Sequence, residues 1–346
     1  MTERSDLLES IANTIKDYRA GEIAAPTLAH VDRWVKQFGK DAQIPLLREV
    51  NHVFKATYFS KNLVSKFFAN QIKHKELAGI DPRAFWHAAN LLTIQQHGHS
   101  QAEILTFFGK DLKKQCGIQI KECGSASGDF IYLDDVLFSG NRVGNDLSEW
   151  IKDDAPDAAV VHIIVIACHR LGEWQMLERL KKEATAAEKK IKFHCWAAVR
   201  FENRKKYRDQ SEVLWPAFLP DDAGLKAYMA QEQKYPFEPR QSGAKPEQDI
   251  FSSEEGRQLL ERELLLAGVR IRAGCHDPKR SMRPLGFSAF GLGFGSMIVT
   301  FRNCPNNTPL ALWWGDPEAT SGPFHWYPLL PRKTYAQSFD FAAFGL

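Results

Sequence analysis

The stretch from Phe130 to Gly144, FIYLDDVLFSGNRVG, joins an apolar run to two adjacent carboxylates and then to a Ser-Gly turn. The residues after the turn have helical spacing, and the start of a helix carries unpaired N–H groups and a partial positive charge. The turn is therefore predicted to bind a phosphate group through backbone amides, a hydroxyl group and a cation. The predicted contacts are Phe138, Ser139, Gly140, Asn141 and Arg142.

The two carboxylates, Asp134 and Asp135, stand at the end of the apolar run, directly before this turn. Carboxylates at that place suit the vicinal hydroxyls of a ribose, either directly or through Mg²⁺, which prefers carboxylates, waters and substrate oxygens. One ligand satisfies all these groups, a 5-phosphoribosyl compound, so both acids are predicted to be catalytic and to bind the metal. The alternative is an ordinary strand end whose acids only cap a turn.

Composition and charge set wide limits on what the chain does. It has 346 residues, of which 44% are apolar and 25% charged, and a formal net charge of +3. A net charge so close to zero does not require a nucleic acid or a membrane as partner. The longest apolar run, VVHIIVIAC, is far shorter than the roughly 20 residues that span a bilayer. The N-terminus lacks the basic and apolar blocks of a secretory signal, and the six cysteines form no paired motif, so a cytoplasmic protein with reduced thiols is expected.

Three regions are expected to position the candidate site. Residues 1–80 show helical spacing of apolar residues and predict a helical N-terminal region. Residues 81–203 alternate short apolar runs with helical patterns, which predicts an α/β domain. Residues 204–346 contain a polar, Pro-containing segment, KYPFEPRQSGAKPEQD, interpreted as a linker or an exposed excursion. A helix, SSEEGRQLLERELLLAG, and a β-hairpin around CPNNTP, in GFGSMIVTFRNCPNNTPLALWWG, are expected to follow.

The middle region supplies the strands and helices of the predicted sheet. Strands are expected at AANLLTIQ, GIQIKE, FIYLDD, VVHIIVIACH and KFHCWAAVRFEN, and helices at SQAEILTFFGKDLKKQ, NRVGNDLSEWIKD and LGEWQMLERLKKEATAAEKK. This alternation, with near-continuous apolar strands, favours a parallel sheet covered by helices on both faces. Ligands of such sheets bind outside the carboxyl ends of the strands. The loops HGHS, the acid pair with its turn, and ACHRLGEW are therefore expected to meet at one edge, where His169 and Arg170 could contact an acceptor.

The segment FIYLDDVLFSGNR resembles the ribose-phosphate binding motif of type I phosphoribosyltransferases, which bind phosphoribosyl pyrophosphate and Mg²⁺. The resemblance implies that an earlier loop holds pyrophosphate. In this chain that loop is matched by HGHS, namely His97, Gly98, His99 and Ser100. It also implies a flexible loop before the motif strand, matched by GSASG, and a C-terminal α+β hood over the acceptor. The chain departs from the motif at Phe138 and Arg142, where the family usually places hydroxyl or small residues, and at the large Tyr132.

Four further segments, HVDRWVKQF, LLTIQQHGHSQAEIL, RPLGFSAFGLGFG and PNNTPLALWWG, are similar to phosphoribosyltransferase-like proteins of bacterial conflict systems, some of which accompany retrons in phage defence. This resemblance covers nearly the whole chain. It implies an effector that binds phosphoribosyl pyrophosphate or a nucleotide, together with a defence-system protein or nucleoprotein partner. Two alternatives stay open: a non-catalytic sensor of such a metabolite, and a scaffold that binds nucleic acid through the basic runs NRKKYR and PKRSMR.

Overall fold

The computed structural model describes residues 2–95, 100–232, 236–318 and 325–332. The chain forms two compact units, neither of which is a single continuous segment. Unit 1 is built from Met1–Tyr58, Pro216–Pro239 and Ile250–Leu346, and unit 2 from Phe59–Trp215 and Arg240–Asp249. The domain boundaries expected at residues 80 and 203 stay a prediction.

Unit 2 contains the predicted parallel sheet. Its four strands lie in chain order: β2 (Asn90–Leu91), β3 (Phe130–Leu137), β4 (Ala158–His169) and β5 (Lys190–Phe201). Each strand runs parallel to its neighbour, with Phe130 paired to Val161 and Val161 paired to Phe193. β4, the most apolar segment of the chain, is buried over most of its length, as expected for an inner strand of a covered sheet. The predicted α/β architecture with a parallel sheet flanked by helices is confirmed.

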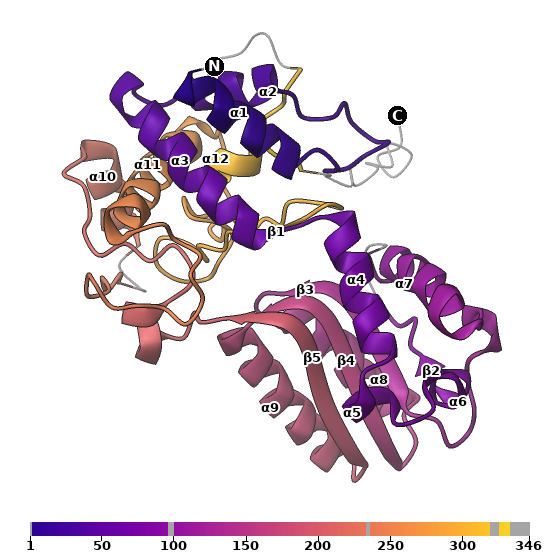
Figure 1. The fold of residues 1–346 in the computed structure, drawn as a ribbon. Helices are drawn as coiled ribbons and strands as arrows, with labels where there is room; N and C mark the ends of the chain where they lie inside the picture. The colour runs from indigo at the N-terminus through magenta and orange to yellow at the C-terminus, as the bar shows by residue number, and fades with distance from the viewer. Residues whose placement is uncertain (1, 96–99, 233–235, 319–324, 333–346) are drawn as a thin grey trace, which may run out of the picture. The chain divides into compact units, whose positions relative to one another are not determined.

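Helices α8 (Asn141–Asp153) and α9 (Arg170–Ala186) cover one face of this sheet. Their buried side chains share one core with Tyr132 of β3 and with Val161, Ile163 and Val165 of β4. Figure 1 shows α9 alongside β5. The stripe Gly172, Met176, Leu180 and Ala184 is the buried side of α9 and repeats every four residues, which is the spacing of one helix face.

Helices from the amino-terminal part of unit 2 pack on the other face. They are α4 (Lys61–Ile72), α5 (Lys75–Ala78), α6 (Pro82–Ala88) and α7 (Ser100–Cys116). His162 alternates with Val161 and Ile163 along β4, and its ring contacts Phe85 of α6 at 6.1 Å between centroids. Trp86 in turn packs against Phe108 of α7, with centroids 5.1 Å apart. The sheet is thus enclosed by helices on both sides.

Unit 1 is mainly helical. Its helices are α1 (Glu3–Thr14), α2 (Leu28–Val35), α3 (Lys40–Thr57), α10 (Ala223–Gln231), α11 (Glu254–Gly274) and α12 (Leu310–Trp313). Two hydrogen bonds join its N-terminal and C-terminal segments: the Trp34 indole N–H donates to the Ala311 carbonyl at 2.8 Å, and the Tyr18 hydroxyl donates to the Pro331 carbonyl at 2.9 Å. Among the residues described above, no helix has both the length and the apolar character needed to cross a membrane.

Two short segments differ from the expected structure. The predicted strand GIQIKE contains a 3-10 helix, Ile120–Glu122, because the side chains of Gln119 and Glu122 form a capping box across that turn. The predicted hairpin is also wrong, since its second run forms α12 after Pro309. Leu and Ala favour a helix, and a short apolar run does not by itself distinguish a strand from a buried helical turn.

The remaining elements are short. Two-residue strands occur at β1 (Tyr58–Phe59) and β6 (Val299–Thr300), and a second 3-10 segment spans Lys205–Gln210. The strand predicted at AANLLTIQ is present but contains only Asn90–Leu91.

Candidate functional site

The predicted phosphate-binding turn connects β3 to α8. Gly140 is the N-cap of α8 and has a left-handed backbone conformation, with φ of +73° and ψ of −1°. The Ser139 hydroxyl accepts a hydrogen bond from the Asn141 N–H at 3.4 Å. Ser139, Asn141 and Arg142 are exposed, so the hydroxyl and the cation of the turn are accessible to a ligand. A helix of 13 residues follows, which provides the amide-rich N-terminus that the sequence predicts.

The turn packs closely against the first turn of α9. A Cβ atom on Gly140 would lie 2.6 Å from the Gly172 carbonyl oxygen and 2.8 Å from the Met176 Cβ. In the other direction, a Cβ on Gly172 would lie 1.9 Å from the Phe138 carbonyl oxygen. Both glycines are therefore required by the close approach of two backbones. The starts of α8 and α9 are held together at the carboxyl ends of β3 and β4.

The two predicted acids have different surroundings. Asp134 is only 3% exposed, and one of its carboxylate oxygens accepts from the Asp135 N–H at 2.9 Å. Asp135 is half-buried, and its Oδ1 accepts from the Val136 N–H at 2.8 Å. Asp135 is thus the more accessible of the two carboxylates.

Tyr132, one of the departures from the motif, lies beside Asp134 together with Asp146, which the sequence did not single out. The Tyr132 hydroxyl donates to Asp146 Oδ2 at 2.7 Å, and both side chains are buried. Burial raises the pKa of Tyr132; the charges of Asp134 and Asp146 raise it further, and Arg142 opposes them. Asp146 comes one helical turn after Arg142 on α8, and that spacing is the only sequence signal that could have placed it near the turn.

His169, the last residue of β4, packs against the inner side of the turn. Its ring stacks on Phe138 with centroids 5.2 Å apart and an interplanar angle of 29°, and it also contacts Phe201. Nδ1 lies 3.3 Å from the Leu137 carbonyl oxygen, so it is placed to donate to that carbonyl. Complete burial lowers the pKa of His169 to about 4. His169 is therefore a neutral packing residue next to the turn, and not the surface contact expected from its position at the strand end.

The predicted pyrophosphate loop falls mostly outside the described residues. His97, Gly98 and His99 are not among them, and Ser100 is described only as the first residue of α7. The position of β2 is informative, because this strand lies next to β3 and leads into that loop. The role of HGHS stays a prediction.

The GSASG segment lies at the opposite end of β3 from the Ser139 turn. Asn90 Nδ2 donates to the carbonyls of Ser125 and Gly128, at 2.9 Å in each case. A Cβ on Gly128 would lie 1.8 Å from the Ala88 carbonyl oxygen. The segment is thus pinned near the amino ends of β2 and β3. The match of this segment to the flexible loop that precedes the motif strand stays a prediction.

The carboxylates of Asp134 and Asp135 are the groups of the candidate site that could bind a metal ion. Within the described parts of the chain, no group of three or more His, Cys, Asp or Glu side chains could hold a metal ion. Mg²⁺ does not require such a group, since one or two carboxylates and the phosphates of a substrate suffice. The half-buried carboxylate of Asp135 fits that role, whereas Asp134 is almost fully enclosed.

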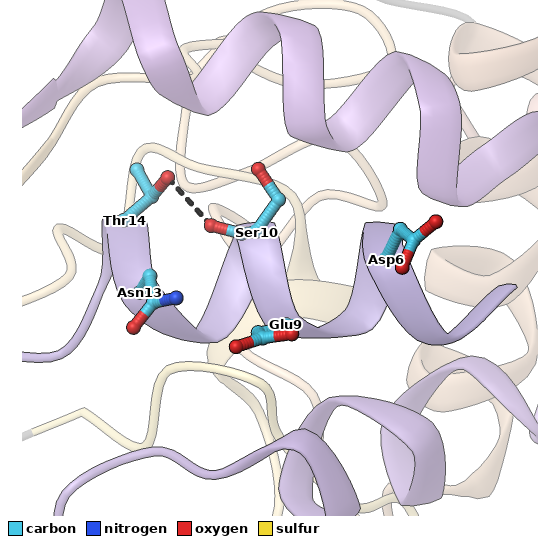
Figure 2. A pocket seen from close by; sticks show the side chains of 5 residues that line it. All are labelled: Asp6, Glu9, Ser10, Asn13 and Thr14. Carbon is cyan, nitrogen blue, oxygen red and sulfur yellow. Dashed lines mark hydrogen bonds between the residues drawn. The ribbon is translucent and has the colours of Figure 1, made fainter. Parts of the chain in front are cut away.

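A separate surface hollow lies on α1 in unit 1. Figure 2 shows the side chains of Asp6, Glu9, Ser10, Asn13 and Thr14 around it. The Thr14 hydroxyl donates to the Ser10 carbonyl at 2.9 Å, a bond within the helix itself. None of the predicted site residues lines this hollow, and its side chains supply no phosphate-binding cation.

A parallel sheet with an acid pair near the carboxyl end of one strand, followed by a glycine turn into a helix, is the arrangement of a phosphoribosyltransferase-like protein. A sequence model of the PRTase-CE family matches residues 31–332, and the chain therefore belongs to this phosphoribosyltransferase-like family. No curated protein and no solved structure matches the chain.

Proposed function

We propose that this chain binds phosphoribosyl pyrophosphate or a related nucleotide at the β3–α8 turn and acts as an effector enzyme in bacterial antiphage defence. The observation that carries the proposal is the pairing of Gly140, in its left-handed conformation, with the exposed Ser139 and Arg142 at the start of a long helix. Backbone amides, a hydroxyl and a guanidinium then meet where a 5-phosphate would bind. Membership of the phosphoribosyltransferase-like family supports the same ligand class.

Asp135 and Asp134 have different roles in the proposed site. Asp135, half-buried and next to the turn, is placed to hold the ribose hydroxyls. Asp134, buried beside Tyr132, orients the strand end through its hydrogen bond from the Asp135 N–H. In this scheme Asp135 contacts the ligand, and Asp134 fixes the position of Asp135.

In the transfer reaction, the bond from ribose C1 to the pyrophosphate oxygen breaks, and its electron pair leaves with pyrophosphate. A new bond forms from C1 to a nucleophilic atom of the acceptor, which releases its proton to solvent. The ribose passes through an oxocarbenium-like state whose positive charge is stabilised by a nearby carboxylate. Mg²⁺, when bound, would neutralise the charge of the leaving pyrophosphate.

A non-catalytic sensor is the second candidate, and Phe138 favours it. The ring of this residue stacks on the buried His169 and occupies a turn position where the transferase motif usually has a hydroxyl or small side chain. The turn therefore holds its ligand with fewer side-chain donors, which suits binding without turnover. A sensor of this kind would pass the signal to a partner protein or nucleoprotein of the defence system.

Pyrophosphate release separates the two candidates. The chain is incubated with phosphoribosyl pyrophosphate, Mg²⁺ and candidate acceptors, and release is compared with binding measured by calorimetry. An enzyme is expected to release pyrophosphate, and to stop when Mg²⁺ is chelated. The Asp135→Asn variant, which keeps the shape of the side chain, should lower turnover roughly 100-fold. Tight binding without release would establish the sensor, and full activity of Asp135→Asn would remove that carboxylate from the mechanism.

A further inference from the structure

Residues Arg240–Asp249 form a short segment, here called the strap, that belongs to unit 2 although the chain on both sides of it belongs to unit 1. It contains no helix or strand. Its sequence, RQSGAKPEQD, contains no large apolar side chain, so apolar burial contributes little to holding it against the sheet. The contacts that hold it are hydrogen bonds and charge pairs.

The strap is anchored at the carboxyl end of β5. The Gln248 N–H donates to Glu212 Oε1, and the other oxygen of Glu212 accepts from the Glu202 N–H at 2.7 Å. Glu202 directly follows the last residue of β5. Near the other end of the strap, the Gln241 N–H donates to Asp209 Oδ1 at 2.8 Å. The strap therefore lies at the edge of the sheet where the carboxyl ends of the strands gather.

Between these anchors, Glu247 pairs with Arg170. Arg170 Nη2 donates to Glu247 Oε2 at 2.6 Å. The Arg170 side chain is 31% exposed and that of Glu247 is 65% exposed. An exposed ion pair contributes little to stability because water and salt screen it. The guanidinium of Arg170 is thus held by a partner that another anion can replace.

Arg170 stands between two residues that touch the phosphate-binding turn. The preceding residue, His169, stacks on Phe138. Two residues later, Gly172 packs against the backbone of the turn at Phe138 and Gly140. Arg170 is also the first residue of α9, whose start lies beside the start of α8. The backbone of Arg170 therefore lies at the same edge of the sheet as the turn.

Two further carboxylates, Glu212 and Glu202, lie near Arg170. Burial raises the pKa of Glu212, the charge of Glu247 raises it too, and Arg170 lowers it. Arg170 likewise helps to lower the pKa of Glu202, for which burial is opposed chiefly by hydrogen bonds from Arg204. Without Arg170, Glu247 and Glu212 would lose the cation near both of them, whereas Glu202 would keep its ion pair with Arg204. A phosphate drawn to Arg170 must therefore displace Glu247, because the local charge does not favour adding a further anion.

We propose that the strap is an autoinhibitory element in which Glu247 occupies the guanidinium that would bind a phosphate oxygen of the ligand at the Ser139 turn. A carboxylate and a phosphate offer Arg the same pair of acceptor oxygens, so one can replace the other. Ligand binding exchanges Glu247 for the phosphate and releases the middle of the strap. This inference rests on the proposed function, and it adds a second cation and a regulatory contact to the same site.

Calorimetry with phosphoribosyl pyrophosphate and Mg²⁺ tests the exchange on the full chain. In Glu247→Gln the competing charge is gone, so the affinity should rise about two- to fivefold, the range expected for one exposed ion pair. Glu178→Gln is the matched control, because it removes one charge from an exposed pair with Lys181 on the same helix α9; its affinity should equal that of the wild type. Arg170→Gln should bind more weakly, and adding Glu247→Gln to it should change nothing further.

Hydrogen exchange of the strap provides a readout independent of affinity. Peptides covering 240–249 should exchange faster in Glu247→Gln than in the wild type, and ligand should produce the same increase in the wild type. If both proteins bind the ligand with equal affinity, and their strap peptides exchange equally fast without ligand, the autoinhibitory role is overturned and the proposed site stands. Absence of binding by every variant would overturn both proposals together.

Discussion

His169 is enclosed between the rings of Phe138 and Phe201, and it is the ionisable group that packs directly under the candidate site. Protonation would place a charge in a fully buried position, which is why its pKa falls to about 4 from the ordinary value near 6.5. Its Nδ1 is placed to donate to the Leu137 carbonyl, at the end of β3. The protonation state of this histidine is thus linked to the packing of the turn.

Because of His169, the free energy of unfolding is predicted to decrease when the pH is lowered. Between about pH 6.5 and pH 4 the unfolded chain binds a proton at this side chain that the folded chain does not bind. The free energy of unfolding therefore decreases as the pH falls through that window, by roughly 3 kcal/mol in total. Above pH 6.5 the residue has no such effect.

Urea titrations of the wild type and of His169→Phe at several pH values measure this contribution. Other histidines, such as His162, whose pKa is also lowered by burial, affect both proteins equally. The difference between the two curves should therefore shrink or reverse in favour of the variant as the pH drops. Parallel curves from pH 7 to pH 4 would contradict the assignment.

The acids illustrate what the sequence could and could not predict about single residues. The order of apolar strand, acid pair, Ser-Gly turn and helix was enough to locate a candidate site. It could not show that Asp134 is buried, nor that Asp146, 14 positions beyond Tyr132, accepts a hydrogen bond from the Tyr132 hydroxyl. The contacts that form when α8 packs on β3 cannot be predicted from the sequence of either segment alone.

At the scale of elements, the β3–α8 turn is fixed by its packing on α9. Gly140 has both a left-handed backbone conformation and no room for a side chain, since a Cβ would lie 2.6 Å from the Gly172 carbonyl. Gly117, which follows α7, has a similar φ of +70°, but a Cβ there would meet only Arg83 at 3.5 Å, an ordinary contact. Substitutions at the two glycines therefore distinguish the cost of backbone strain from the cost of steric exclusion.

Gly140→Ala is predicted to destabilise the chain more than Gly117→Ala. The left-handed conformation costs an alanine about 1 kcal/mol at either position, and displacing the start of α9 adds about 2 kcal/mol at Gly140. Denaturant unfolding gives the two values, and calorimetry with inorganic phosphate should show weaker binding for Gly140→Ala alone. Equal losses of stability would mean that α9 moves aside without cost, contrary to the close packing.

Long elements followed from the sequence, and short ones did not. β3, β4, β5, α8, α9 and α11 lie where the apolar pattern predicts them, because each repeats its period several times. The segments GIQIKE and LALWW are too short to show a period. Their structures depend on a capping interaction between Gln119 and Glu122 and on a proline before α12, so apolar content alone gave the wrong strands.

At the scale of the whole molecule, unit 1 is assembled from segments far apart in the chain. Glu49 of α3 is 1% exposed, and it accepts hydrogen bonds from the Ser252 N–H at 3.1 Å and from the Ser252 hydroxyl. These partners are 203 positions apart. Sequence periodicity carries no information about such pairings, which is why consecutive regions were the natural prediction from the sequence.

Glu49→Gln is predicted to loosen unit 1 without loosening the sheet of unit 2. Hydrogen bonds to a buried carboxylate contribute about 1.5–3 kcal/mol in total, and an amide retains only one acceptor oxygen. Hydrogen exchange should therefore accelerate in α3 and at the start of α11, while β3, β4 and β5 keep their protection. Glu9→Gln, an exposed change on α1, is the control and should leave both units unaffected. If exchange instead rises equally in α11 and in β4, the two units unfold together, contrary to this prediction.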